Sequence, residues 1–236
     1  GPFQNDIAAY RQLDRKYQEL MESDLSSISK IYFLIEACKR YGTIPFSGFA
    51  RSAFIAVQWL GAMKKEGFIT EQDRIDFLDS LHSLPVQLAS DLAEFSKEEF
   101  IAKYGHLRPG TYDITNDNYA IGYNQYFVGR AESPQHRTPK SWSEEKLEQL
   151  DGWLQKQKIN VNARELVQFM KQAIELREEA KFAFTRYINA ILEILTEYGK
   201  TFGFTRDELS FADIQSIKAL HSQLGHENMV SFLSGV

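Results

Sequence analysis

Apolar residues recur every three or four positions along most of this chain, which is the spacing of one face of an α-helix. Prolines, glycines and helix-capping side chains divide this pattern into successive helices. The predicted helices run from about Asp6 to Met21, from Asp24 to just before Gly42, from Pro45 to Lys65, from Thr70, from Pro85, from Ser96 to Tyr104, from Ser143 to about Lys158, and from Asn162 to about Thr201. Two short helices close the chain. The pattern therefore predicts an all-α fold with many helices.

Two features stand out from this pattern. The helix that starts at Asn162 is predicted to be the longest and to span about 60 Å, at about 1.5 Å per residue. Residues 105–142 show no helical period and are rich in Gly, Pro, Asn, Tyr and Ser. A structureless segment of this length is usually functional or disordered. Its many aromatic residues favour an ordered loop.

The long helix carries one charge in an otherwise apolar row. Alternating steps of four and three define this row, called the seam below: Leu166, Met170, Ala173, Arg177, Ala180, Phe184, Tyr187, Ile191, Ile194 and Tyr198. A buried guanidinium needs an anionic partner, because burying a charge without one is very costly. Arg177 is therefore a candidate ligand-binding residue. An internal ion pair, or a side chain that extends to solvent at the helix edge, is the alternative.

The helix from Pro45 to Lys65 is apolar on almost every side, which predicts a central, buried position. Arg51 and Gln58 lie two turns apart on one face of it. A polar line on a buried helix indicates either a binding site or an internal polar network, and both interpretations stay open.

A short loop after Tyr104 holds most of the remaining candidate chemistry. Pro109 and Gly110 restrict its shape, because Pro109 fixes its own backbone and Gly110 permits positive φ. His106 is a candidate catalytic base or hydrogen-bond donor. The remaining candidates are substrate-binding side chains: Arg108, Tyr112 and Asp113. The alternative is an ordinary connection between helices, in which Asp113 only caps a turn.

Composition narrows the class of protein. A formal net charge of −5 argues against a nucleic-acid partner, and no apolar run is long enough to span a membrane. Cys38 is the single cysteine, which fits a reducing, cytoplasmic location. The five histidines lack metal-ligand spacing, so no metal site is expected. The opening Gly1-Pro2 resembles a protease scar, and we expect residues 3–236 to form one domain excised from a longer enzyme.

Two segments carry a family resemblance. The run from Tyr104 to Ile114 resembles the "RYGHR…GE.DI" segment of the helical middle region of phosphoenolpyruvate-synthase-like phosphotransferases. Residues 177–181, Arg186, Gly203 and residues 207–214 are similar to a second pattern of that region, "RE..K..R…G.L…eD…L". The group includes rifampin phosphotransferase and the bacterial capsule L-glutamine kinases. The chain departs from the common pattern at residues 107–110 and at Thr111, where an acid is frequent.

The resemblance implies a function and a set of partners. In this family, ATP and Mg²⁺ act in an ATP-grasp domain, and a swivelling phosphohistidine domain carries the phosphoryl group to the acceptor. The sequence lacks a Walker loop, a dinucleotide fingerprint, a nucleophile elbow, an ATP-grasp pattern and the swivelling-histidine signature. The chain would therefore hold the acceptor, need no cofactor of its own and be inactive alone. L-glutamine, the acceptor of the capsule-biosynthesis kinases, is the first candidate.

The resemblance also implies roles for the candidate residues. Phosphoryl transfer requires cations near the acceptor, and Arg51, Arg108, Arg177 and Lys181 are expected to supply them. Asp113 would bind the ammonium group of glutamine, and the loop would line one pocket with Arg51 and Arg177. Two alternatives remain. One is another small acceptor, such as a phosphosugar or a drug-like molecule, and the other is a non-catalytic helical module whose seam binds a partner helix.

Overall fold

The computed structural model describes residues 2–81, 84–129 and 142–222, and within these ranges all regular secondary structure is helical. This confirms the all-α prediction. The α-helices are α1 (Pro2–Tyr10), α2 (Leu13–Met21), α3 (Ser27–Ala37), α4 (Ile44–Lys65), α5 (Glu71–Asp79), α6 (Leu84–Glu94), α7 (Lys97–Tyr104), α8 (Tyr123–Tyr126), α9 (Glu144–Lys156), α10 (Ala163–Lys200), α11 (Arg206–Leu209) and α12 (Ile214–Ser222). One π-helical turn, η1 (Cys38–Thr43), joins α3 to α4.

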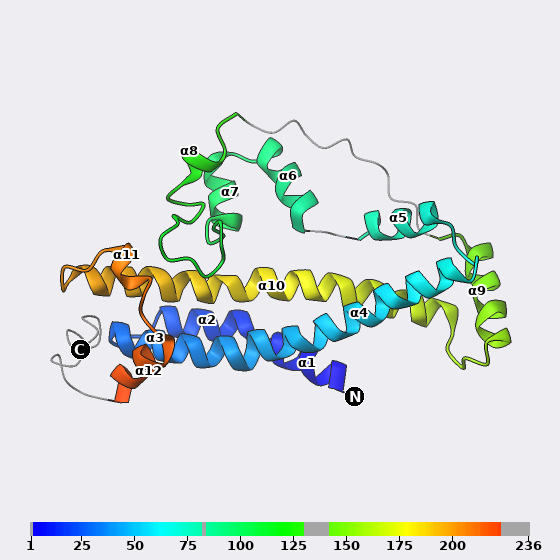
Figure 1. Cartoon of the computed structure of the whole chain (residues 1–236), viewed down its shortest axis with the longest axis horizontal. Coiled ribbons are helices and arrows are strands. Elements are labelled where there is room, and N and C mark those ends of the chain that lie inside the picture. Colours follow the sequence, from blue (N-terminus) through cyan, green and yellow to red (C-terminus); the bar gives the residue numbers. More distant parts are fainter. Residues whose placement is uncertain (1, 82–83, 130–141, 223–236) are drawn as a thin grey trace.

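The axis of the molecule is α10, which has 38 residues and is about 57 Å long at about 1.5 Å per residue. Helix α4 lies beside it in the opposite direction. The start of α4 packs Phe46 on Phe184, while Leu60 near its end shares a core with Leu166 at the start of α10. Figure 1 shows the two helices side by side, with α1, α2 and α3 along the same face. The predicted length of the long helix and its predicted first and last residues are confirmed.

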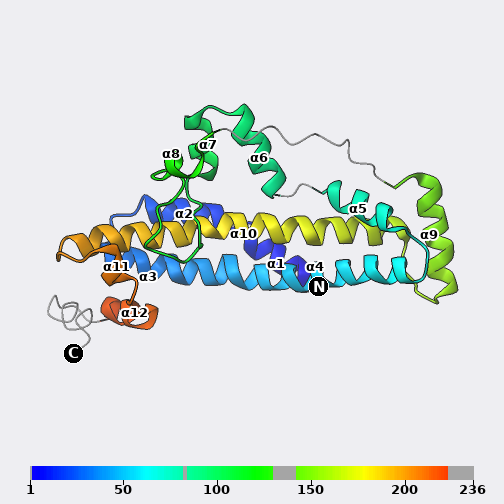
Figure 2. The same ribbon diagram turned by 45° about the horizontal axis from the view of Figure 1, so that its top comes forward.

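The other helices cover the two ends and one flank of α10. Helices α5 and α9 lie at the end where α10 begins, and α11 and α12 lie where it finishes (Figure 1). Helices α6, α7 and α8, with the loop between α7 and α8, form a separate layer over the middle and second half of α10, and the turned view agrees (Figure 2). This layer carries the predicted functional loop.

Local capping explains where many helices start. Capping boxes are present at Ser96, at Thr205 and also at Thr70, where Asp73 completes the pair. The side chains of Ser143 and Asn162 accept from backbone N–H groups at the starts of α9 and α10. These starts were predicted, because a cap needs only groups that lie two or three residues apart.

Two boundaries near the N-terminus differ from the prediction. Residues 6–21 were expected to form one helix, but the chain turns at Arg11 and Gln12 and so forms α1 and α2. The second helix begins at a cap made by Ser26, not Asp24, and passes through η1 directly into α4 without ending before Gly42. Tertiary packing decides both points, since Leu13 and Cys38 lie in one core with Phe184.

The predicted central position of α4 is wrong. Its buried positions form one face, while Phe54 is 67% exposed and Ile55 is 52% exposed on the other. Arg51 and Gln58 share that exposed side. The apolar residues on both sides of α4 suggested burial, but α10 and α1 cover only one of these two sides.

Among the described residues, no helix is both long enough and apolar enough to cross a membrane.

Candidate functional site

The loop that follows α7 lies against the second half of α10. Backbone bonds close the loop on itself, from the N–H of Tyr119 to the carbonyl of Leu107 at 2.7 Å and from Ala120 to Gly105 at 3.1 Å. Only glycine fits at position 105, because a Cβ there would lie 2.4 Å from the Ile101 carbonyl oxygen. Gly105 is helical in φ and ψ, so glycine is needed there for close approach and not for a positive-φ helix end.

The buried side chain of Arg108 holds this loop against α10. Its side chain is 1% exposed. One terminal nitrogen donates to the carbonyls of Asp113 at 3.3 Å and Asn116 at 3.2 Å. The other donates to Asn189 Oδ1 at 2.6 Å and Glu193 Oε1 at 2.7 Å. A guanidinium with its terminal nitrogens engaged in this way is a structural group, so the expectation that Arg108 faces an open acceptor pocket is wrong.

Tyr112 and Asp113 are exposed at the tip of the loop. The carboxylate of Asp113 accepts from the hydroxyl of Thr115 at 2.6 Å and from the backbone N–H of Thr115 at 2.9 Å, and these bonds lower the pKa of Asp113. The amide of Asn116 also donates to it, at 2.7 Å. This is the turn-capping alternative that the sequence left open. Gly110 has φ of +67°, as predicted, and Tyr112 is 72% exposed.

His106 is held as a neutral packing residue. Its Nε2 lies 3.2 Å from the carbonyl oxygen of Phe182, and its ring packs edge-on against the Phe182 ring. Burial lowers the pKa of His106 to about 4, with a small further contribution from Arg186. A base with that pKa is largely unprotonated at neutral pH but accepts a proton weakly. The geometry therefore supports a structural role more than the predicted catalytic one.

Arg177 does not occupy a buried seam position. Its side chain is 41% exposed and bonds to Glu178 Oε1 at 2.6 Å, although Ala173 and Ala180 on either side of it are fully buried. The long stem of arginine lets the charge reach solvent at the helix edge, which was one of the alternatives. The prediction of a buried Arg177 is wrong, and Lys181 on the same helix is also exposed.

The expected pocket that joins the loop with Arg51 and Arg177 is also absent from the described structure. Arg108 meets α10 at Asn189, which is 12 residues from Arg177 and so about 18 Å away along the helix. Arg51 is exposed on the side of α4 that α10 does not cover. The three arginines therefore point to separate places.

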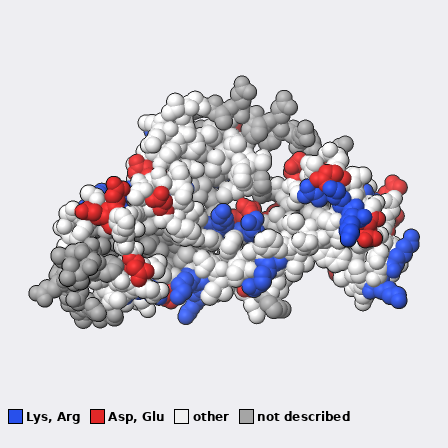
Figure 3. All heavy atoms as spheres, viewed as in Figure 1, with Lys and Arg blue, Asp and Glu red and all other residues white. Residues whose placement is uncertain are grey.

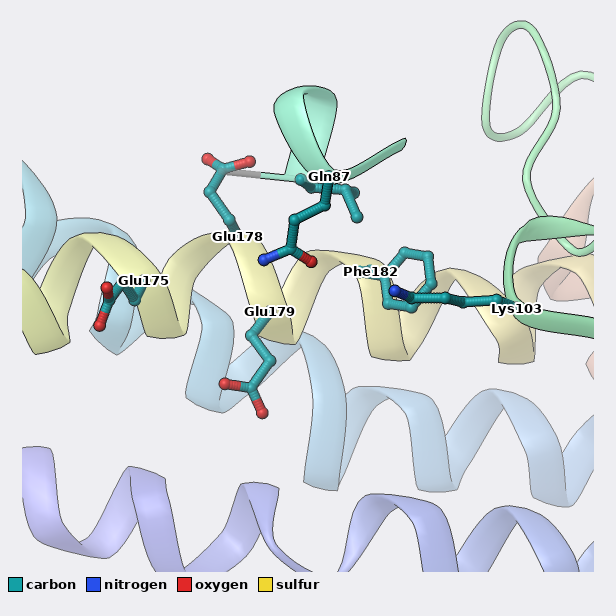
Figure 4. A pocket seen from close by; sticks show the side chains of 7 residues that line it. Gln87, Lys103, Glu175, Glu178, Glu179 and Phe182 are labelled. Carbon is teal, nitrogen blue, oxygen red and sulfur yellow. The ribbon is translucent and has the colours of Figure 1, made fainter. Parts of the chain in front are cut away.

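The two resembling segments nevertheless come close together, because Tyr104 and His106 of the first contact Phe182, which directly follows residues 177–181 of the second. A cleft of about 370 Å³ lies between α6, α7 and the middle of α10. Its lining residues come from all three helices: Leu84, Gln87, Lys103, Glu175, Glu178, Glu179 and Phe182. Figure 4 shows Gln87 extending from α6 toward α10 and Lys103 extending from α7 toward Phe182. Phe182 lines the cleft and also packs against His106 of the loop, so the same side chain contacts both.

Carboxylates outnumber cations in this cleft. Glu178 is paired with Arg177, and Glu179 Oε1 accepts from the hydroxyl of Tyr10 at 2.9 Å. Lys103 donates to Asp91 Oδ2 at 2.6 Å, and this bond raises the pKa of the lysine. In the space-filling view, side chains of both signs gather over the middle of α10 (Figure 3). The cleft is therefore acidic, with one ammonium at its edge.

This arrangement suits a small molecule with charges of both signs. Three carboxylates on one helix favour an ammonium group, and an ammonium donates up to three hydrogen bonds. Lys103 has donors beyond the one given to Asp91, which favours a carboxylate on the ligand. Phe182 and Leu84 add an apolar wall for a methylene stem. Among the described residues, no group of three or more metal-ligating side chains is placed to hold a metal ion.

Several of these residues were missed from the sequence. Glu175 and Lys103 line the cleft, while Asn189, Glu193 and Arg206 hold the loop. The signal was a second row on α10, offset from the apolar seam, in which polar residues recur at positions 175, 178, 179, 186, 189 and 193. A polar row of this kind also fits a solvated helix face, so only the position of α6 and α7 distinguishes the two.

Comparison with known proteins adds no relative. Neither a scan against family models nor searches of curated proteins and of solved structures found a match for this chain.

Proposed function

We propose that this chain is the acceptor-binding domain of an ATP-dependent phosphotransferase and that it binds a small zwitterion in the acidic cleft. The observation that supports this most is the meeting of the two family-like segments there. Lys103 directly precedes the first segment, Glu178 and Glu179 belong to the second, and Phe182 directly follows residues 177–181 of the second. L-glutamine remains the first candidate, from the resemblance to capsule L-glutamine kinases.

The cleft offers a group for each part of glutamine. The ammonium group is placed against the carboxylates of α10, the α-carboxylate against Lys103, and the side-chain amide against the amide of Gln87. This replaces the expected contacts with Arg108 and Asp113, which are engaged elsewhere. Arg177, beside Glu178 at the edge of the cleft, is the cation best placed to meet an incoming phosphoryl group.

The catalytic parts of the reaction lie outside this chain in the proposal. A phosphohistidine domain of the parent enzyme would dock over the cleft and pass its phosphoryl group to the acceptor. An ATP-grasp domain with ATP and Mg²⁺ would recharge that histidine. The parent enzyme would act in the cytoplasm, in capsule biosynthesis. Acceptor binding to the isolated domain would be modest, because such sites close only when the second domain docks.

A phosphosugar fits the cleft less well. A sugar phosphate carries one or two negative charges and no ammonium group, so it would favour several cations and no acid. The cleft instead presents Glu175, Glu178 and Glu179 with Lys103 alone from the opposite side. Like charges repel, and the cleft would select against such an acceptor.

The second candidate function is a helical interaction module. The buried seam of α10 does not support this, but the outer face of α4 does, because Phe54, Ile55 and Val57 are all more than 40% exposed there. Exposed apolar patches often mark protein contacts. Sedimentation analysis of the chain and of Phe54→Asp would test it. Concentration-dependent association that the substitution abolishes would favour this alternative.

Isothermal titration with L-glutamine, D-glutamine and L-glutamate tests the main proposal. We expect L-glutamine to bind with a Kd of about 1 mM, or about −4 kcal/mol, and the other two more weakly. Glu175→Gln should weaken L-glutamine binding about tenfold, as expected for loss of a hydrogen bond to a charged group. Glu165→Gln is the matched control, since it changes an exposed glutamate on the same helix outside the cleft.

The lysine is tested in the same way. Lys103→Met should weaken binding, while Lys97→Met, on the same helix but outside the cleft lining, should leave it unchanged. Equal or absent heats for all three ligands at millimolar concentration would remove glutamine as the acceptor. Equal effects of the cleft and control variants would place the binding site elsewhere.

A further inference from the structure

A second cavity lies at the end of α10 that is farthest from α9, and the proposed acceptor site does not include it. It has a volume of about 380 Å³ and is enclosed by α3, η1, α10, α11, α12 and the tip of the loop after α7. Its lining residues are Ile35, Cys38, Lys39, Thr43, Tyr112, Ile114, Ile188, Ile191, Leu192, Leu195, Leu209, Ser210, Ala212, Ile214 and Ile217. Segments more than a hundred residues apart therefore build one chamber.

The walls of this chamber are aliphatic and its rim is polar. Ten lining residues are Ile, Leu or Ala. Ile35, Leu195 and Leu209 are buried in one core cluster and form fixed walls. Tyr112 and Ile214 are exposed and mark an opening to solvent. Since a water-sized group occupies about 30 Å³, the chamber has room for a chain of about 12 such groups.

One cation at the rim is only weakly paired. Lys39 Nζ lies 3.5 Å from Glu36 Oε1, and Lys218 Nζ lies 2.7 Å from the same oxygen. Two ammonium groups thus share one carboxylate, and one positive charge is left over beside the opening. Lys39 itself is 55% exposed and lines the cavity. Tyr112, which also lines the cavity, carries a hydroxyl that is a further donor.

We propose that this cavity binds an amphiphile with an aliphatic chain of about ten carbons and a carboxylate head. The chain would fill the aliphatic chamber, and the carboxylate would lie at the rim against Lys39 and the hydroxyl of Tyr112. The positive charge left over at the rim selects an anionic head over a neutral or cationic one. Tyr112 was expected to bind the small polar acceptor, and here it takes a different ligand. This proposal does not depend on the function proposed for the acidic cleft.

Isothermal titration of the full chain with decanoate, decan-1-ol and decyltrimethylammonium tests the head group. Decanoate should bind at one site and most tightly, followed by the alcohol and then the cation. Chain length tests the chamber. Each buried methylene contributes about 0.8 kcal/mol, a factor of about four in Kd, so octanoate should bind about 15-fold more weakly than decanoate. Dodecanoate should gain little, because the chamber is full.

Two variants locate the ligand. Ala212→Phe places a ring in the chamber and should abolish decanoate binding, with folding checked by a thermal melt. Lys39→Met keeps the apolar stem and should weaken decanoate binding about two- to fivefold, the range of an exposed ion pair, without changing that of decan-1-ol. Lys200→Met is the matched control, because Lys200 is also exposed and paired three residues away, with Glu197, but lies outside the cavity lining.

Several outcomes would overturn the proposal. Absence of decanoate binding, or equal binding of the three head groups, would do so. So would a steady gain in affinity beyond ten carbons, which indicates adsorption to an open surface. Decanoate binding by a folded Ala212→Phe at the strength of the unaltered chain would also exclude the chamber. If Ala212→Phe fails to fold, equal effects of the Lys39 and Lys200 substitutions would exclude the rim.

Discussion

Two contact regions along α10, called joints below, are held by different chemistry. At the joint with α9 and the end of α4, the buried contacts are mainly apolar: Leu60 and Met63 of α4, Leu150 and Leu154 of α9, and Met170 lie fully buried in one cluster. At the joint with the loop after α7, a polar network fastens the loop to the second half of α10. There, Arg108 and Arg206 both bond to Glu193, and Asn118 bonds to Asn189.

Because of this difference, substitutions at the two joints should lower stability in different ways. An apolar cluster loses stability in proportion to the volume removed, because each contact is weak and replaceable. In a buried polar network, the loss of one partner leaves the others unpaired in a medium of low dielectric constant. The loop joint should therefore be the more brittle of the two, although it buries fewer large side chains.

Arg108→Met should give the largest effect. It removes the hydrogen bonds that the buried cation donates to Glu193, Asn189 and two backbone carbonyls, and leaves Glu193 with Arg206 as its remaining ion-pair partner. We expect the free energy of unfolding to fall by about 4 kcal/mol, measured by urea denaturation. Arg164→Met, which breaks an exposed pair with Glu144, is the control and should cost less than about 1 kcal/mol. Equal losses for the two variants would contradict a special role for the loop network.

At the apolar joint, Leu154→Ala should lower the free energy of unfolding by about 3 kcal/mol, the transfer cost plus a cavity term. A second truncation in the same cluster, Met170→Ala, tests the comparison further, since truncations that share one buried cluster are coupled and their losses should not simply add. Denaturation of the double variant measures this. A loss in Leu154→Ala as small as in an exposed Leu25→Ala would show that this cluster is not a closed core.

His106 should make the loop joint sensitive to acid. Its folded pKa of about 4 lies below the ordinary value of 6.5, so the unfolded chain binds the proton first. The contribution to stability is complete above pH 6.5 and is lost as pH falls toward 4, by about 2 kcal/mol at pH 5. Denaturation of the chain and of His106→Gln from pH 7 to pH 5 isolates this change, because glutamine can donate to the Phe182 carbonyl but does not titrate. Parallel pH curves would contradict it.

Helix caps should have the smallest effect and should not distinguish the two joints. Thr70→Ala removes a capping box near the start of α10, and Thr205→Ala removes one near its end. Each should lower the free energy of unfolding by about 1 kcal/mol, because the lost hydrogen bond is local. Denaturation midpoints measure both. A cost at Thr205 several times larger would mean that α11 is coupled to the loop network through Arg206.

Much of the fold was predictable from groups close together in the chain. The caps at Ser96, Ser143, Asn162 and Thr205, and the apolar seam of α10, depend on spacings of two to four residues. The candidate site was less predictable. The loop shape at Pro109 and Gly110 was anticipated, but Arg108 was expected to bind a ligand, and its actual partners lie 81 and 85 residues away.

Local spacing thus sets which residues are helical, where those helices start and which of their faces are apolar. It does not set which apolar face is covered. Phe49 and Phe54 lie on one helix and are equally apolar, yet Phe49 is fully buried and Phe54 is 67% exposed, because α10 and α1 pack on only one side of α4. The same holds for charge: from the sequence, Arg51, Arg108 and Arg177 were all expected to line one pocket. Only the layer of α6, α7 and the loop over α10 buries Arg108 and leaves the others in water, since burial of a charge requires partners that no single helix contains.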